Sequence, residues 1–432
     1  MNKVGLILAS IFLSIASFSQ ELYFPPTLGS NWETTSPSEL GWCEDEIPAL
    51  LQFIDESDSK AFIVLKDGKI VIEHYVGTFT QDSLWYWASA GKSLTAFLIG
   101  LAQQNGDLDI NDASNIYLGD GWTSLTPEQE NAITVRNHLT MTTGLDDTDE
   151  NFDCLDPECL TYLEDPGERW AYHNGPYTLL DSVMYYATGQ NLNAYVFDNL
   201  SLSTGIFGSF IFSNNNNVFV SKARAMARFG LLALNQGTWA NTPILSDEDY
   251  FYDMTHTSQE LNKAYGYLWW LNGSADYMLP GIQFQFPGPL MVDAPMDVFA
   301  AMGKNGQIIN VSPSENLVVV RMGNEPTNEV FYVPNVYNNQ IWQYLTPVIC
   351  NTSSTNEVSI KNSLEIYPNP ASDVIRFGQL IDNVSIHDAT GTLAIQASRA
   401  SELDITSLPS GLYILNGKIN GTVISKRFTI SK

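Results

Sequence analysis

The sequence predicts an α+β protein: an antiparallel sheet flanked by helices, followed by a small all-β sandwich. Strand-like segments stand near both ends of the first 350 residues, with helical patterns between them. A polar run at 351–356 ends this arrangement, and only short strand-like segments with Gly, Pro or Asn turns follow it. The length of 432 residues, 44% of them hydrophobic, is enough for two or three domains.

The first domain is predicted to begin with a β-hairpin. Residues 61–77 hold two β-rich runs, FIVL and IVIEHYV, on either side of Asp67-Gly68. This pair favours a tight turn between two strands.

Two helices are predicted in the middle of this domain. One begins at Ser89 and ends at Gly106, and the other covers 221–237. The first shows apolar residues at helical spacing, namely Leu94, Phe97, Leu98 and Leu101. Near the domain end, FAAMG, QIINV and LVVVRMG predict three strands. We expect these last strands to meet the first hairpin in one antiparallel sheet.

The net charge of −28 makes a broad nucleic-acid interface improbable, because phosphate contacts need clustered Lys and Arg. The charge is uneven along the chain. Residues 351–432 contain seven basic and seven acidic residues, so the whole excess lies upstream. This break in charge coincides with the polar run, and we interpret 351–361 as a linker.

Residues 1–20 are typical of a secretory signal, with Lys3 before an apolar stretch and the small residues Ser17 and Ser19 at the expected cleavage point. The apolar stretch is too short to span a bilayer, so no stable membrane anchor is expected. An exported chain can keep disulfides. We favour the pairs Cys154–Cys159 and Cys43–Cys350, with free buried thiols as the alternative. No spacing typical of metal ligands occurs, and no cofactor is expected.

The main candidate for chemistry is Ser89-Ala90-Gly91-Lys92. A serine hydroxyl becomes a nucleophile when a base takes its proton. At i and i+3 of a helix, Ser89 and Lys92 share one face, and a desolvated lysine can serve as that base. A second copy of the pattern, Ser57 to Lys60, stands in a polar cluster, and we interpret it as a solvated turn.

A second element is Tyr172-His173-Asn174. A tyrosine beside a lysine cation can ionise below its usual pKa and pass on the serine proton. The Asn174 amide can orient the lysine and the substrate, whereas a lone histidine is more often structural. Two other Y-x-N matches, at Tyr337 and Tyr367, are interpreted as loops.

A third element is the glycine strand at 301–307, AMGKNGQ. Glycine lets a backbone pass close to a substrate, and an amide there could form an oxyanion hole with the Ser89 amide. Asn305-Gly306 is also a turn signal, so a plain hairpin is the alternative. The phrase YGYLWW at 265–270 could line an acyl pocket or belong to the core, and we favour the core.

The order S-x-x-K, Y-x-N and glycine strand resembles the serine β-lactamase, D-alanyl-D-alanine peptidase and esterase superfamily. Its class C-like branch, which includes 6-aminohexanoate-dimer hydrolases, is the most similar. The phrases ITVRNHLTMTTGL, PGERWAYHN and SKARAMARFGLLALNQG also resemble that family, and the likeness covers about 45–345. The resemblance implies a β-lactamase/transpeptidase-like fold with a helical subdomain over 21–350. It also implies an acyl-enzyme on Ser89, with Lys92 and Tyr172 as general base and acid.

The third motif departs from the class C pattern K-T-G. Lys304-Asn305-Gly306 matches it by letters, but we prefer to align Ala301-Met302-Gly303, with the Lys304 amide in the oxyanion hole. Asn174, Gly303 and Lys304 are then the substrate and oxyanion residues. This alignment leaves no side chain to bind a β-lactam carboxylate, so an ester or amide substrate, small or peptide-like, is expected. β-Lactamase or D-alanyl-D-alanine peptidase activity is the alternative.

The tail resembles the C-terminal sorting domain of type IX secretion. The resemblance rests on IYPNP at 366–370, LPSGLYI at 408–414 and KRF at 426–428. It implies a sorting domain over 362–432, export through the periplasm, and release or surface attachment by the secretion machinery. Two further readings remain for the first domain. A Ser-His-Asp hydrolase lacks support because no G-x-S-x-G occurs, and a catalytically silent binding module on the same fold is the rival.

Overall fold

The computed structural model describes residues 22–148, 152–213, 215–326, 332–350, 366–388, 393–419 and 422–432. The expected signal at 1–20 and linker at 351–361 lie outside the described residues. The chain divides into two compact units, Met1–Cys350 and Asn351–Lys432.

The first unit is built on a six-stranded antiparallel sheet in the order β2-β1-β13-β12-β11-β8. Its strands are β1 (Ser59–Lys66), β2 (Lys69–Tyr75), β8 (Trp270–Leu271), β11 (Phe299–Gly303), β12 (Gln307–Ser312) and β13 (Leu317–Gly323). Shorter pairings use β3 (Trp85–Tyr86), β4 (Gly208–Ser213), β5 (Asn216–Ser221), β6 (Thr238–Trp239), β7 (Thr242–Pro243), β9 (Asp276–Leu279) and β10 (Ile282–Pro287).

The predicted hairpin is confirmed, and so is the pairing of the first and last strands of this domain in one sheet. Strands β1 and β2 pair around Asp67 and Gly68, whose φ angles of 51° and 82° fit the left-handed turn that suits a twisted hairpin. On its other edge β1 pairs with β13, with Val64 opposite Val319. The three strands predicted near the domain end are β11, β12 and β13.

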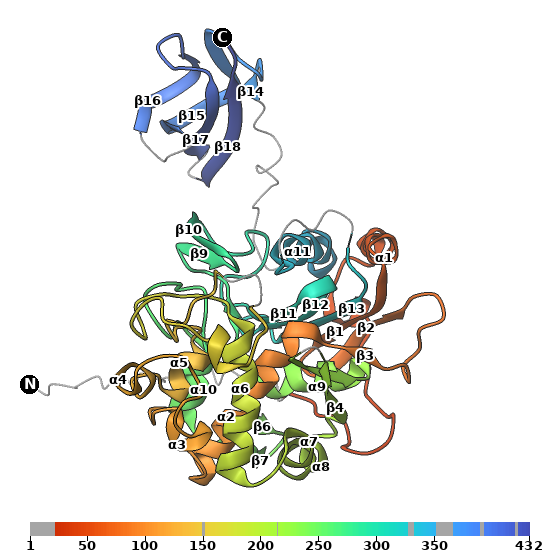
Figure 1. The fold of residues 1–432 in the computed structure, drawn as a ribbon. Coiled ribbons are helices and arrows are strands. Elements are labelled where there is room, and N and C mark those ends of the chain that lie inside the picture. Colours follow the sequence, from red (N-terminus) through yellow and green to blue (C-terminus); the bar gives the residue numbers. More distant parts are fainter. Residues whose placement is uncertain are drawn as a thin grey trace, which may run out of the picture. The chain divides into compact units, whose positions relative to one another are not determined.

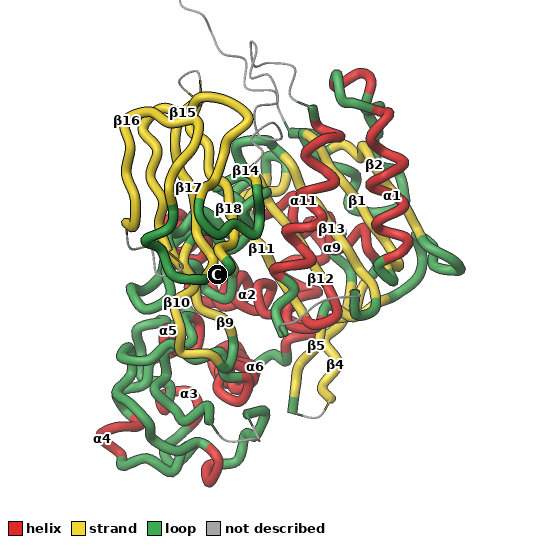
Figure 2. Tube along the Cα trace, turned by 90° about the horizontal axis from the view of Figure 1, so that it is seen from above, coloured by secondary structure: helices red, strands yellow, loops and turns green. Residues whose placement is uncertain are grey.

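Helices cover both faces of this sheet (Figures 1 and 2). The helices of this unit are α1 (Ile47–Glu56), α2 (Gly91–Asn105), α3 (Asn115–Leu118), α4 (Pro127–Glu130), α5 (Val135–Leu139), α6 (Asn174–Thr188), α7 (Leu192–Val196), α8 (Leu202–Thr204), α9 (Ala223–Leu234), α10 (Glu248–Thr255) and α11 (Asn335–Ile349). Of these, α1 and α11 pack on one face of the sheet and α9 on the other. The neighbouring residues Ile309 and Asn310 of β12 point to opposite faces. A side chain at Gly230 of α9 would meet Ile309, whereas Asn310 exchanges two hydrogen bonds of 2.7 Å with Asn338 of α11.

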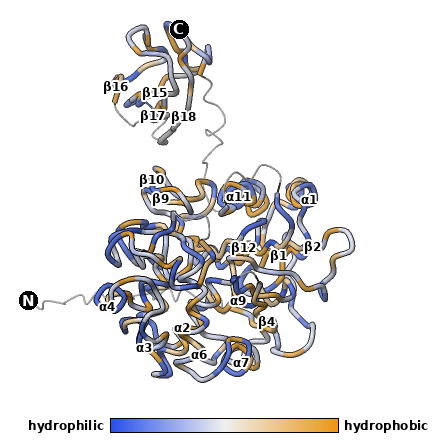
Figure 3. Tube along the Cα trace, viewed as in Figure 1, coloured by the Kyte–Doolittle hydropathy of each residue, from blue (hydrophilic) through white to orange (hydrophobic). Residues whose placement is uncertain are grey.

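The core of the first unit lies between the sheet and these helices, where Figure 3 shows the hydrophobic stretches of α2, α9 and the central strands. Both predicted helices are confirmed as α2 and α9. Gly106 ends α2 in the left-handed conformation, with φ of 77°. The favoured disulfides are also found, Cys43–Cys350 and Cys154–Cys159.

The second unit is all-β, as predicted. Its strands are β14 (Ile366–Tyr367), β15 (Val374–Asp388), β16 (Leu393–Asp404), β17 (Gly411–Ile419) and β18 (Thr422–Ile430). With 15 and 12 residues, β15 and β16 are longer than the short strands that were expected. They pair with each other, and β15 also pairs with β14 and β17. A bridge between Ala371 and Ile430 shows that this one sheet curls towards closure around its own core.

Within the described part of both units, every helix is too short or too polar to cross a membrane.

Candidate active site

Ser89 stands in a short 3₁₀ turn, Ala88–Ala90, that leads into α2. The residue before this turn is firmly held. Trp87 is fully buried, its amide donates to the Phe219 carbonyl at 2.8 Å, and its indole donates to Ser221 at 2.8 Å. Ser89 itself is only half-buried, so its hydroxyl can be reached at the positive N-terminal end of α2.

Lys92 lies one turn further along α2 and is only 4% exposed. Its Nζ lies 3.7 Å from the ring centre of Tyr177 and 5.5 Å from that of Tyr172. Burial disfavours the charged form and lowers the pKa of Lys92 to about 7, although the carboxylates of Asp153 and Asp181 oppose this shift. A large share of Lys92 is therefore neutral near pH 7, as a base requires.

Tyr172 is buried beside Lys92, and its hydroxyl lies near enough to the Ser89 side chain for that group to favour its ionised form. Its ring stacks on Trp270 with centres 5.9 Å apart and meets the edge of Tyr265 at 6.3 Å. Burial raises the pKa of Tyr172 well above its usual value, and the nearby Ser89 side chain offsets only part of the rise. The expectation that Tyr172 ionises below its usual pKa is therefore wrong in direction, because desolvation of the buried phenol dominates.

Asn174 is the first residue of α6, and its Nδ2 donates to Asp153 Oδ1 at 2.8 Å. The amide oxygen of Asn174 is buried, with no partner among the described residues. The neighbouring His173 is buried, and desolvation lowers its pKa to about 4, so it is neutral at pH 7.

Gly303 ends β11 directly against the Ser89 turn. A Cβ at this position would lie 2.8 Å from the Ser89 nitrogen, 2.7 Å from the Ala90 nitrogen and 2.6 Å from the Trp87 carbonyl oxygen. Only glycine allows so close an approach. The third sequence element thus reaches the serine through its backbone.

The next residues form the turn into β12, which begins at Gln307 as expected. Asn305 and Gly306 have φ of 65° and 71°, so the hairpin reading of this segment also holds. The Lys304 side chain is exposed, and the Asn305 amide donates to the Tyr86 hydroxyl at 2.7 Å.

Two carboxylates that act on Lys92, those of Asp153 and Asp181, were not predicted from the sequence. Asp181 accepts a short hydrogen bond from Asn217, and burial raises its pKa to about 7. A signal for it existed, because Asn174, Tyr177 and Asp181 stand at i, i+3 and i+7 of α6 and share one face. Asp153 stands in a loop, where no periodicity marks it.

The family model for beta-lactamase matches residues 54–339 of this chain. The chain belongs to the beta-lactamase family. A second model, the secretion system C-terminal sorting domain, matches residues 365–431. This type IX sorting domain indicates export, to the cell surface or the medium, and implies the secretion machinery as a partner. No curated protein matches the chain.

Solved structures share the fold at low sequence identity. A Bacillus anthracis protein provisionally named a 6-aminohexanoate-dimer hydrolase matches with a TM-score of 0.56 and 17% identity, over 73% of this chain and 87% of its own. A Bacteroides dorei DSM 17855 protein provisionally named a beta-lactamase matches with a TM-score of 0.53 and 16% identity, over 71% and 97%. A family VIII carboxylesterase matches with a TM-score of 0.53 and 15% identity, over 73% and 99%.

The second S-x-x-K copy of this beta-lactamase family domain is not a solvated turn, and that interpretation is wrong. Ser57 and Ser59 are each 5% exposed. Ser57 shares a hydrogen bond of 2.7 Å with the Tyr337 hydroxyl, and Arg321 donates to Ser59 at 2.9 Å. Tyr337 was interpreted as part of a loop, but it lies in α11. Ser57 and Ser59 thus accept hydrogen bonds from the guanidinium of the buried Arg321, which also donates to the Asn305 carbonyl at 2.6 Å.

The YGYLWW phrase divides between the site and the core. Tyr265 and Trp270 pack on Tyr172, whereas Trp269 packs on Phe229 and Phe299 in the interior. All four aromatic residues of the phrase are at most 2% exposed. The favoured core reading therefore holds, and two of these rings also support the tyrosine of the site.

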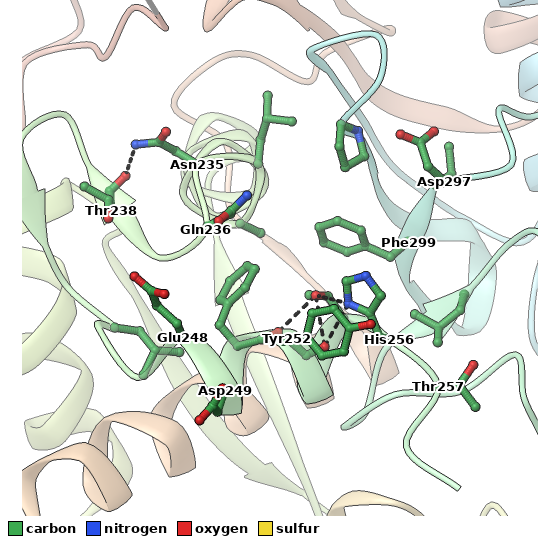
Figure 4. Close-up of a pocket in the computed structure, with 18 of the residues that line it drawn as sticks. Asn235, Gln236, Thr238, Glu248, Asp249, Tyr252, His256, Thr257, Asp297 and Phe299 are labelled. Carbon is green, nitrogen blue, oxygen red and sulfur yellow. Dashed lines mark hydrogen bonds between the residues drawn. The ribbon is translucent and has the colours of Figure 1, made fainter. Parts of the chain in front are cut away.

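A cavity of about 1320 Å³ lies elsewhere in the domain, between the end of α9, α10 and β11 (Figure 4). Tyr252 and His256 stack there with ring centres 3.8 Å apart, near Phe299 and Asp297. None of the six predicted site residues lines it. Its size alone does not outweigh the chemistry gathered at Ser89, so we place the candidate site at the serine.

Proposed function

We propose that this exported beta-lactamase family protein is a serine hydrolase that cleaves ester or amide bonds through an acyl-enzyme on Ser89. The observation that carries the proposal is the gathering of three groups at the half-buried Ser89: the buried Lys92 one turn along α2, Tyr172 with its ring centre 5.5 Å from the Lys92 Nζ, and the backbone of Gly303. A serine in this setting has a proton acceptor within reach and remains open to substrate.

In the proposed acylation step, the Ser89 hydroxyl attacks the carbonyl carbon and gives up its proton. Neutral Lys92 is the base, because burial keeps much of it uncharged near pH 7. Tyr172 keeps its own proton at this pH, so it acts as a relay. Its phenol accepts the serine proton while it passes its own proton to Lys92, and no free tyrosinate forms.

The negative charge that develops on the carbonyl oxygen needs hydrogen-bond donors. The Ser89 amide is one candidate, and the Lys304 amide is the other, because it follows Gly303 at the point where β11 meets the serine turn. A donor pair of this kind lowers the barrier by a few kcal/mol when it is preorganised.

Collapse of this intermediate breaks the bond to the leaving group, an alcohol or an amine, which takes the proton from protonated Lys92 through Tyr172. Water then attacks the acyl-enzyme carbonyl and gives a proton to Lys92. The second intermediate collapses to the acid, and Ser89 takes the proton back from Lys92 through Tyr172. One ester or amide and one water thus yield one acid and one alcohol or amine.

For the substrate we propose neutral small or peptide-like esters and amides. The Asn305 side-chain amide donates to the Tyr86 hydroxyl and is therefore not free to bind a substrate carboxylate. The similarity to a family VIII carboxylesterase and to a protein provisionally named a 6-aminohexanoate-dimer hydrolase fits this choice.

The test is labelling of the mature chain with a fluorophosphonate probe, which reacts with activated serines. We expect labelling of the wild type and of Ser57→Ala, the matched variant in the other S-x-x-K copy, and none of Ser89→Ala. A folded wild type that stays unlabelled would instead support the silent binding module. Equal loss in both serine variants would refute the assignment of Ser89.

A further inference from the structure

A loop closed by the disulfide Cys154–Cys159 lies on the first turn of α6. The Gly175 amide donates to the Phe152 carbonyl at 2.9 Å. A Cβ on Gly175 would lie 2.4 Å from the Cys154 carbonyl oxygen, so only a glycine lets the loop backbone lie this close to the helix. Cys154 is buried at 4% exposure, whereas residues 156–158 are exposed. The disulfide therefore ties the buried part of the loop, at Cys154, to its exposed turn at 156–158.

Asp153 directly precedes the buried Cys154, and its Oδ1 accepts the 2.8 Å hydrogen bond from Asn174 Nδ2. An ionised carboxylate can only accept, and in the Asn174 side chain only the NH₂ arm can donate. Asp153 therefore fixes which way round the Asn174 amide stands. The oxygen arm, buried and without a partner in the described part of the chain, is left to accept from Lys92 or from a substrate N–H.

We propose that Asp153 is a positioning residue for the hydrolase site, and that the Cys154–Cys159 disulfide holds it there, so that full activity requires this loop to be oxidised. The inference rests on the proposed function. Without Asp153 the Asn174 amide can turn over and present its NH₂ arm, a donor, where the intact site presents an acceptor. Without the disulfide, the buried Cys154 loses its covalent tie, and Asp153 is held by fewer constraints.

Asp153 also has an electrostatic effect that a purely structural residue would lack. Its charge is the largest factor that opposes the lowered pKa of Lys92, and Asp181 of α6 is the other carboxylate acting on that lysine. Removing the charge of Asp153 alone should lower the pKa of Lys92 further. The acid limb of the pH–activity profile should then move to lower pH, because Lys92 becomes neutral earlier.

The experiment measures kcat/KM for p-nitrophenyl butyrate from pH 5.5 to 9, together with the thermal unfolding of each variant. We expect Asp153→Asn to lose about tenfold in kcat/KM, the usual scale for one charge-assisted hydrogen bond, and to show the shifted acid limb. The double variant Cys154→Ser/Cys159→Ser should lose a similar factor. The control Asp156→Asn removes an exposed carboxylate of the same loop and should keep the wild-type rate.

The second disulfide offers a matched control. Cys43→Ser/Cys350→Ser removes a tie between residues 307 apart in sequence, so it should lower the unfolding temperature and leave kcat/KM unchanged. Wild-type kcat/KM and an unshifted pH profile in Asp153→Asn would overturn the inference, even if the loop cysteine variant failed to fold. A wild type that neither hydrolyses the ester nor reacts with fluorophosphonate would overturn the proposed function, and this inference with it.

Discussion

Replacing Lys92 by methionine should abolish hydrolysis and, at the same time, make the folded protein more stable near neutral pH. Lys92 is 4% exposed, and burial moves its pKa from 10.5 to about 7. Each pKa unit is worth about 1.4 kcal/mol, so holding the charged lysine in this place costs the fold about 5 kcal/mol. Methionine keeps a similar apolar stem and carries no charge.

One contact reduces the gain. The Lys92 ammonium lies 3.7 Å from the centre of the Tyr177 ring, a favourable interaction of about 2 kcal/mol that methionine lacks. The attraction of Asp153 and Asp181 for the lysine is already contained in its pKa of about 7. We therefore expect a net gain of about 3 kcal/mol in the free energy of unfolding for Lys92→Met at pH 6.

The pH dependence of this gain has a definite sign. Between about pH 7 and 10.5 the unfolded chain holds the Lys92 proton, whereas the folded chain has released it. Because the unfolded state binds more protons in this window, wild-type stability rises with pH there. The advantage of Lys92→Met should thus be largest below pH 7 and shrink as pH approaches 10.5.

The assay is urea unfolding at pH 6 and pH 9, followed through the fluorescence of the ten tryptophans. Lys60→Met is the control, because Lys60 is the partly exposed lysine of the other S-x-x-K copy. Its replacement removes only the contact with the Trp85 ring and should lower stability by about 0.5–1 kcal/mol, by the same amount at both pH values. A Lys92→Met variant less stable than the wild type at pH 6, or one with the same difference at both pH values, would refute the reasoning.

Three further predictions concern the other copy of the motif, the tail and the substrate. Ser57→Ala should lower the free energy of unfolding by about 1–3 kcal/mol, because it removes the buried 2.7 Å hydrogen bond between Ser57 and the Tyr337 hydroxyl, while wild-type kcat/KM is retained; a loss of activity in a folded Ser57→Ala would contradict this. Deletion of 360–432 should leave a folded, active enzyme in the periplasm of the native host, as fractionation and ester assays can show, and normal secretion would refute the sorting role. Nitrocefin should be hydrolysed with a kcat/KM about ten- to a hundredfold below that for p-nitrophenyl butyrate, and a faster rate with nitrocefin would mean that Lys304 binds its carboxylate.

The sequence predicted well those features that local chemistry decides. Asp67-Gly68 turned the first hairpin because both residues tolerate a left-handed backbone. Gly106 ended α2 for the same reason. The pairing of β1 with β13 followed from strand patterns at both ends of a domain whose middle is helical.

Errors arose where distant residues decide the environment. The polar letters around Ser57 suggested solvent, but Arg321 and Tyr337, more than 250 residues away in sequence, bury them in a hydrogen-bonded network. For Tyr172, the nearby lysine suggested easy ionisation, yet the packing of Trp270 and Tyr265 removes water from the phenol and raises its pKa. Neither packing arrangement can be read from spacing along the chain.

Motif signals in the sequence marked several residues of the candidate site but not its supporting charges. Ser89, Lys92 and Gly303 carried motif signals, and the structure brings them together. Asp153 carried none, because its position depends on a disulfide-closed loop that folds back onto α6.

The most direct test of the central claim is to trap the acyl-enzyme. The mature chain is mixed with p-nitrophenyl butyrate, quenched with acid during turnover, digested and analysed by mass spectrometry. We predict one butyryl group on the peptide that contains Ser89, and none when Ser89→Ala is treated in the same way. Ester turnover that continues in Ser89→Ala, or an acyl group found on another serine such as Ser57, would contradict the assignment.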